Sequence, residues 1–414
     1  MTIMEDKMIP KNAEAPVRSY GGFLKNNIRE YGKLLSLVVI MGFFQYMTDG
    51  TLLKPLNLTN LILQNSYIVI MALGMLLIIV GGNIDLSVGS IVGFIGAIAA
   101  TMMVDYKMPW VPVVGLSLLL GALIGAVQGY FVAFAKIPSF IVTLGGMLIF
   151  RGLTGNILLG QFVGPFPKDF QSISSGFIPD FLTDPLTSVI GNALLGPSFR
   201  WTSMAIGIIG AAFLIFSSTK RWNNAKAHTL ETEPFAFFIG KNAIFAILIV
   251  GFSYLLASYR GLPNVLIIMG VLILLYTFVT TRMTIGRRIY ALGGNRLAAQ
   301  LSGIRTERLI FLTFVNMGVL AALAGLIVAA RLNSATPSAG NSFELDVIAA
   351  CFIGGASASG GVGKVMGVVI GAFVMGVMNN GMSILGIGIY WQYVVKGCVL
   401  LAAVYVDVYQ KNNG

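Results

Sequence analysis

The feature that most constrains this chain is a long series of apolar runs, cut by charges or by clusters of glycine, proline and asparagine. Since a membrane-spanning helix takes about 20 residues, 414 residues leave room for roughly ten to twelve spans. The apolar runs lie at 34–48, 64–81, 88–104, 110–134, 139–159, 201–217, 242–258, 262–280, 309–330, 347–356, 364–383 and 388–406. Only 10% of the residues are charged, against about 25% in soluble globular proteins. The sequence therefore predicts an all-α, polytopic helical integral membrane protein, and excludes a soluble, disordered or fibrous chain.

The net charge of +11 is explained by the position of the basic residues, which gather between the apolar runs. Lys and Arg concentrate in the cytoplasmic loops of membrane proteins, so this charge indicates orientation and not nucleic-acid binding. We expect cytoplasmic tails at 1–33 and 409–414, a membrane domain at 34–408, an extracytoplasmic loop at 160–200 and a cytoplasmic loop at 282–308. This orientation requires the short stretch 346–358 to count as a span, or a broken or re-entrant helix to take its place.

A first polar cluster interrupts the apolar pattern between 81 and 90, where Asp85 and Ser87 follow a pair of glycines. Ionisable groups at membrane depth are costly and mark either function or an interfacial turn. Glycines allow a helix to unwind, and the polar groups of such a segment need partners or water. Two interpretations are equally supported: an unwound segment that lines a polar pathway, or a turn in which Asp85 caps the next span.

Two further polar clusters lie near the C-terminal spans. Glu344 and Asp346 stand at the start of a short apolar run, where acidic side chains favour the positive end of a helix. Acidic caps are the simpler explanation of this pair. Asn379 and Asn380 lie near the end of a span, where buried amides either bond a sugar hydroxyl or hold a neighbouring helix, and the second role is slightly favoured.

The sequence predicts no cofactor and no catalysis. Gly363-Lys364 resembles the end of a phosphate-binding loop, but Ala358 replaces the required glycine and Val365 the required hydroxyl residue. The single histidine lies in a polar loop, and both cysteines lie in apolar runs, so no metal-ligand spacing exists.

The most basic loop, 282–308, has an unusual composition. It holds six arginines and one glutamate, and its stretch 284–304 is too apolar for a solvated linker and too charged for a span. Ala298, Leu301 and Ile304 recur at helical spacing behind a pair of glycines. We expect a short helix that presents its apolar side to a partner, or one that lies on lipid headgroups.

Five ordered blocks carry a family resemblance that covers nearly the whole chain after residue 60. They are Gly81 to Ser90, Pro138 to Gly145 with Phe150-Arg151-Gly152, the loop 284–304, Gly340 to Gly361, and Asn379 to Leu385. The chain resembles the permease subunits of bacterial ABC importers for monosaccharides, and its closing blocks look closest to the xylose and multiple-monosaccharide branch. Compared with the shorter ribose-type members of about ten spans, the stretch 201–258 inserts an extra helix pair.

The resemblance implies two permease copies in the inner membrane, a separate ATPase on the cytoplasmic face and an extracytoplasmic sugar-binding protein. ATP hydrolysis then resides in the partner, and the chain is not an enzyme. Asp85, Ser87, Phe140, Thr143, Asn379 and Asn380 are the residues expected along the substrate pathway. Arg331, Glu344 and Asp346 are those expected near the outer mouth. Gly286, Arg287, Gly293, Gly294, Asn295, Ala298 and Gly303 are those expected to couple to the ATPase.

Two other classes of function are weighed against an ABC permease. An ion-coupled secondary sugar transporter would use Asp85 as the coupling carboxylate. A membrane-embedded enzyme would need a nucleophile–base pair or a metal cluster, and neither is present in the sequence.

Overall fold

The protein is helical throughout the part of the chain that the structure, a computed structural model, describes: residues 20–182, 199–228 and 234–412. Ten of its helices are long and apolar enough to cross a membrane. They are α2 (Pro55–Val80), α3 (Val88–Ala100) with the π-helical turn η1 (Thr101–Asp105), α4 (Trp110–Ala133), α5 (Ser139–Leu158), α8 (Trp201–Ala227), α9 (Phe235–Ala257), α10 (Asn264–Thr281), α13 (Thr306–Leu332), α15 (Val365–Ile384) and α16 (Ile389–Asn412). The predicted class, a polytopic helical membrane protein, is confirmed.

Two of the expected spans are short. In α1 (Tyr20–Met47) only the part Gly32–Met47 is apolar. Helix α14 (Phe343–Ile353) has 11 residues, and at 1.5 Å per residue it covers about 16 Å of a hydrocarbon core about 30 Å thick. The total of about twelve is reached only when these two helices are counted. Because α14 cannot cross alone, the stretch 346–358 is the broken segment that the sequence left open.

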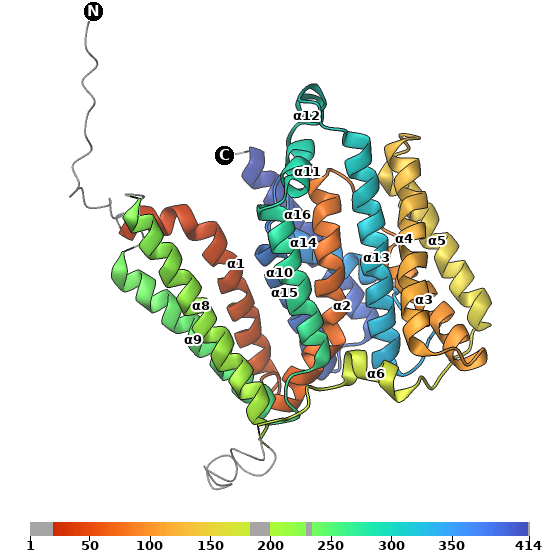
Figure 1. Cartoon of the computed structure of the whole chain (residues 1–414), viewed down its shortest axis with the longest axis horizontal. Coiled ribbons are helices and arrows are strands. Elements are labelled where there is room, and N and C mark those ends of the chain that lie inside the picture. Colours follow the sequence, from red (N-terminus) through yellow and green to blue (C-terminus); the bar gives the residue numbers. More distant parts are fainter. Residues whose placement is uncertain (1–19, 183–198, 229–233, 413–414) are drawn as a thin grey trace, which may run out of the picture. The chain divides into compact units, whose positions relative to one another are not determined.

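The chain divides into two compact units. Among the described residues, the larger unit comprises Lys33–Phe177 and Pro263–Gly414, and the smaller one holds the start of α1 and Ile178–Leu262. In the smaller unit α8 and α9 run side by side (Figure 1). Gly207 lies directly against the Ser253 side chain, and the rings of Trp222 and Phe238 stack 5.4 Å apart. The expected helix pair 201–258 is thus a hairpin with its own packing.

The larger unit is built around α2, which is buried along most of its length. Helix α13 crosses this unit beside α2, α3 and α4 (Figure 1). Gly121 and Gly125 of α4 lie against the α13 backbone at Gly318 and Phe314, with no room for a side chain at either glycine. Small residues let membrane helices approach closely, so these glycines pack α4 on α13.

Short elements connect the spans at both ends of α13. Helices α11 (Thr284–Gly294) and α12 (Arg296–Leu301) precede its N-terminus. Helix α6 (Lys168–Ser175), an amphipathic piece in the stretch 160–200, lies near its other end (Figure 1). The two ends of the larger unit therefore carry different elements.

Gly121→Val tests the packing of α4 on α13. A Cβ at this position meets the Ala322 side chain and the Gly318 carbonyl, so the variant should lose about 1–3 kcal/mol of stability through overpacking. Thermal unfolding in detergent measures the loss. The matched control is Gly115→Val on the same helix, where a Cβ meets nothing within 4 Å; equal stability of the two variants would contradict this packing.

Candidate functional site

The segment between α2 and α3 passes from one end of the larger unit into its interior. Helix α2 ends at Val80 beside Gly293 of α11, whereas Val92 in the second turn of α3 lies against Gly325, near the far end of α13. Gly82 adopts a φ of +78°, a conformation that suits glycine. Irregular backbone inside a membrane protein is tolerated only where protein or water satisfies it. At this break Asp85 and Ser87 are buried whereas Gly82 is exposed, so protein encloses only the end of the segment next to α3.

Asp85 satisfies the polar groups at the start of α3. Its side chain is 1% exposed, and its Oδ1 accepts hydrogen bonds from the Ser87 backbone N (2.8 Å) and the Ser87 Oγ (2.6 Å). Gln128 of α4 donates from Nε2 to the Ser87 Oγ at 2.9 Å. The segment is thus unwound, and Asp85 binds Ser87, the residue before α3, without capping the helix itself. That it lines a polar pathway stays a prediction.

The expected pathway residues of α5 differ in their surroundings. Thr143 is fully buried and donates to the Ser139 carbonyl at 2.9 Å, while Phe140 is 54% exposed on the outer face of the helix. Gly146, one turn further, lies against Gln128 and Ser87. The structure thus brings Ser87 close to α5 and leaves Phe140 on an exposed surface of that helix. Gln128 was not predicted from the sequence.

A second polar cluster surrounds Asp346, which is 1% exposed. Lys396 of α16 places its Nζ 2.9 Å from the Asp346 Oδ1 and 3.0 Å from its Oδ2. The hydroxyl of Tyr67 in α2 donates to Oδ2 at 2.8 Å, and the Asn379 Nδ2 of α15 donates to the same oxygen at 3.2 Å. One carboxylate therefore ties together four helices. Lys396 and Tyr67 were missed by the sequence analysis, although a lysine inside an apolar run was a visible signal.

Asn380 has a different partner from its neighbour Asn379. Asn57 donates from Nδ2 to the Asn380 Oδ1 at 2.8 Å, and Asn380 donates back to the Asn57 Oδ1 at 3.2 Å. This reciprocal amide pair joins α15 to the start of α2. The arrangement fits the expected role of an amide that holds a neighbouring helix.

Glu344 lies beside the N-terminus of α3, close to the segment that carries Asp85. Its Oε2 lies against Gly89, where the Gly340 carbonyl also approaches closely. The N-terminus of a helix carries a partial positive charge that favours both carboxylates. Two clusters that are far apart in the sequence thus meet at one helix end. Next to them Tyr67 stacks on Phe343 at 3.7 Å, and Arg331 is half-buried.

Helix α11 is fixed to the larger unit by close contacts. Gly286 lies on the Val279 carbonyl and Gly293 on the Val80 carbonyl, so a side chain at either position would collide with backbone. The Tyr290 hydroxyl donates to the Gly363 carbonyl at 2.8 Å, and burial raises the pKa of this phenol. Two of the glycines expected to couple to the ATPase therefore have a packing role.

Helix α12, in contrast, turns apolar side chains outward. Asn295 caps it, because its Oδ1 accepts from the Ala298 backbone N at 2.9 Å. Leu297 is 66% and Leu301 83% exposed, and Ala298 is exposed between them. The remaining predicted coupling residues also lie near this surface: Arg287 and Gly294 are exposed, and Gly303 adopts a φ of +80° in the turn after α12. Leu297, Ala298 and Leu301 therefore form an exposed apolar knob next to the firmly packed helix α11. Such a knob suits contact with a partner protein.

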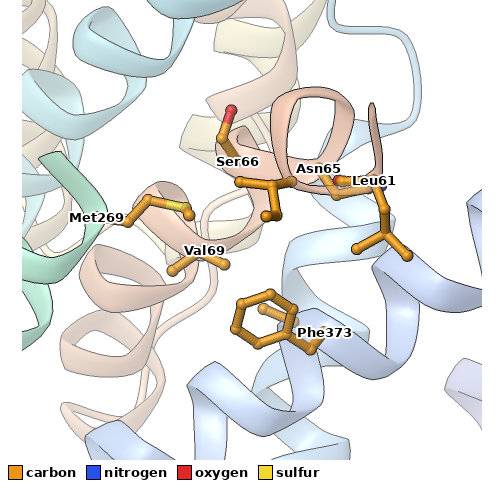
Figure 2. A pocket seen from close by; sticks show the side chains of 8 residues that line it. Leu61, Asn65, Ser66, Val69, Met269 and Phe373 are labelled. Carbon is orange, nitrogen blue, oxygen red and sulfur yellow. The ribbon is translucent and has the colours of Figure 1, made fainter. Parts of the chain in front are cut away.

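Two hollows differ in chemistry. A narrow crevice between α2, α10 and α15, with no room for a water molecule, is lined mainly by apolar side chains such as Val69, Met269 and Phe373 (Figure 2). A larger, open cavity of about 400 Å³ lies beside α12 and is lined in part by charged side chains. The described residues contain no group of His, Cys, Asp or Glu that could hold a metal ion. Of the two hollows, only the larger offers polar recognition.

Lys396→Met tests the cluster at Asp346. Removing one partner of a buried ion pair leaves an uncompensated charge and costs about 3–5 kcal/mol, so the variant should unfold at a clearly lower temperature in detergent. The double variant Asp346→Asn/Lys396→Met should recover most of the loss, because no charge is left buried. Lys168→Met, at an exposed lysine, is the control. A single variant as stable as this control would show that the ion pair is not formed.

Comparisons with known proteins agree with this architecture. The family described as "Branched-chain amino acid transport system / permease component" matches residues 57–404. The xylose transport system permease proteins of Haemophilus influenzae (strain Rd) and Escherichia coli (strain K12) are each 40% identical to this chain over 94% and 97% of its length, and over 98% of their own. The ribose import permease protein of Escherichia coli (strain K12) is 34% identical over 93% of the chain and 95% of its own length. No solved structure matches the chain.

The resemblance predicted from five sequence blocks is confirmed, since the relatives are sugar permeases that align over nearly the full chain. Within the described residues, the long apolar helices and the polar clusters buried among them are those of a multi-pass transport protein. The chain belongs to the family of branched-chain amino acid transport system permease components.

Proposed function

We propose that this chain is the transmembrane permease subunit of an ABC importer for a monosaccharide, xylose or a related pentose or hexose, in the bacterial inner membrane. The observation that carries the proposal is the 40% identity to xylose transport permeases over 94% or more of this chain and 98% of theirs. Such a subunit provides the passage, while a separate ATPase supplies the energy. The chain then carries out no catalysis of its own.

The exposed knob of α12, formed by Leu297, Ala298 and Leu301, supports an ATPase docking site. Apolar side chains that project into water beyond a membrane domain mark an interaction surface. They stand in the loop that holds six arginines, which the positive-inside rule puts in the cytoplasm. We therefore place α11 and α12, both chain termini and the start of α15 on the cytoplasmic side.

The opposite end of the larger unit would face the sugar-binding protein. Helix α6 lies at this end (Figure 1), in the stretch 160–200 that the sequence places outside. Arg331 and Ser342 frame the connection that leads into α14. Arg331, Glu344 and Asp346 are proposed to lie along the route from the outer mouth, with Asp346 in its wall.

The exposed face of α5 supports a passage completed by a second copy of the chain. Phe140, Ile141 and Leu148 are exposed on this helix together with Arg151. An arginine on a membrane span is expected to face a water-filled space or a protein partner, and not lipid. We propose that Phe140 lines the passage directly. Thr143 and the Asp85–Ser87 segment lie behind it as a polar wall, and Asn379 and Asn380 of α15 are proposed as further polar residues along the pathway.

Ala298→Glu tests the docking site. A carboxylate on the exposed knob would be buried against the ATPase, so sugar uptake and recovery of the ATPase with the permease should both fall at least about tenfold. Insertion into the membrane should be normal, because Ala298 is exposed. Asn223→Glu, at an exposed position of α8, should leave uptake unchanged. Normal uptake in the Ala298 variant would refute the docking assignment.

Asp85→Asn separates an ABC permease from an ion-coupled transporter. An amide oxygen accepts the same hydrogen bonds from Ser87 as the carboxylate does, so uptake into vesicles loaded with ATP should stay within about threefold of the unmodified protein. Asp85→Leu, which removes the acceptor, should lose most of the uptake. If the carboxylate instead couples an ion gradient, Asp85→Asn would be inactive, and an ionophore would stop uptake while ATP is plentiful.

A further inference from the structure

The cavity beside α12 is built from four separate segments of the larger unit. It is an open hollow of about 400 Å³ between the break before α3, the turn that joins α4 to α5, helix α12 and the first turns of α13. Its polar lining is Asn83, Lys136, Ser139, Arg296, Gln300 and Glu307. The proposed ATPase-docking helix is therefore one wall of a polar hollow.

The charge of this cavity is not balanced. Lys136 and Arg296 are both exposed, and neither has a salt-bridge partner among the residues that the structure describes. Glu307 is the one acid of the lining, and it accepts a long hydrogen bond of 3.4 Å from the Gln300 Nε2. Arg296 and Lys136 both attract the Glu307 carboxylate. Two cations face one carboxylate, so the lining keeps one net positive charge, which favours an anionic occupant.

We propose that this cavity receives an acidic side chain of the ATPase subunit when that subunit docks on α12. The inference rests on the proposed function and deepens it by naming the chemistry of the contact. Leu297 and Leu301 project from the same helix that carries Arg296 and Gln300. A single partner surface with an apolar cleft and an adjacent carboxylate would engage the knob and the cavity together.

The floor of the cavity connects this contact to the interior. Asn83 lines the cavity, and the next residue, Ile84, donates its backbone N to the Ser139 Oγ at 3.3 Å. Ile84 in turn precedes Asp85, which is bonded to Ser87. A carboxylate that enters the cavity therefore reaches the start of the buried segment that contacts α4. Filling or emptying the cavity can displace this segment without movement of α11, whose glycines are packed against backbone.

The decisive experiment reverses the two cationic positions together, as Lys136→Asp/Arg296→Glu. Aspartate is chosen at 136 because Lys136 has a φ of +59°, which aspartate tolerates better than glutamate. With the ATPase co-expressed and both subunits purified in detergent, ATPase recovery should fall at least about tenfold, because attraction becomes repulsion. The matched control is Lys220→Asp/Arg221→Glu, an equal charge change at exposed positions of α8, which should keep full recovery.

A neutral pair of substitutions distinguishes the loss of a charge contact from misfolding of the permease. Lys136→Asn/Arg296→Gln should lower ATPase recovery less than the reversal does, and should flatten its dependence on salt. Salt screens exposed charges, so recovery with the unmodified permease should decrease between low and high ionic strength. An unchanged salt dependence in the neutral variant would overturn the proposal.

The variant Leu301→Asp distinguishes failure of this proposal from failure of the proposed function. If Leu301→Asp releases the ATPase while the charge reversal retains it, docking on α12 stands and the acidic contact is refuted. If both variants retain the ATPase, the docking assignment itself fails. A photo-crosslinker in place of Arg296 should join the co-expressed ATPase at a segment that bears Asp or Glu; crosslinks only to lipid or to a second permease would also refute the contact.

Discussion

The cost of leaving a polar group without a partner inside a membrane is the constraint on which the rest of this structure depends. A membrane interior offers no water to an interrupted helix or a carboxylate. The break before α3 meets this cost with Asp85, Ser87 and Gln128, and the broken segment at α14 meets it with Asp346 and Lys396. In each irregular segment a buried carboxylate is joined by a polar side chain from another helix, Gln128 of α4 or Lys396 of α16.

These two irregular segments converge on the N-terminus of α3. Gly89 of α3 and Gly340, which precedes α14, touch through their backbones, and the Glu344 side chain lies at the same place. Because a helix begins there, its partial positive charge accepts carboxylates that would otherwise be very costly. Contact this close requires glycine at 89, and the φ of +80° at Gly340 also suits glycine. A single helix end thus organises two distant parts of the chain.

Features that depend on local composition are predictable from this sequence, whereas features that depend on long-range pairing are not. The spans were predictable because an apolar run of the right length has only one way to satisfy its backbone in lipid. The partners Gln128, Tyr67 and Lys396 were missed because each stands alone in an apolar helix, and only the fold shows what it faces. Asn379 and Asn380 are adjacent, yet they bond Asp346 and Asn57 respectively, since consecutive residues of a helix point about 100° apart.

The basic loop combines two roles that its sequence does not separate. Gly286 and Gly293 have no space for a side chain and hold α11 against the ends of α10 and α2, whereas Gly294 and Ala298 face open space. Helix α11 therefore has no room to move when a force acts on α12. The compliant element is the hollow between α12 and the break before α3, because a packed core transmits strain while an open cavity can change volume. If the ATPase docks on α12 as proposed, movement there would be directed toward Asn83 and the buried Asp85 two residues further on.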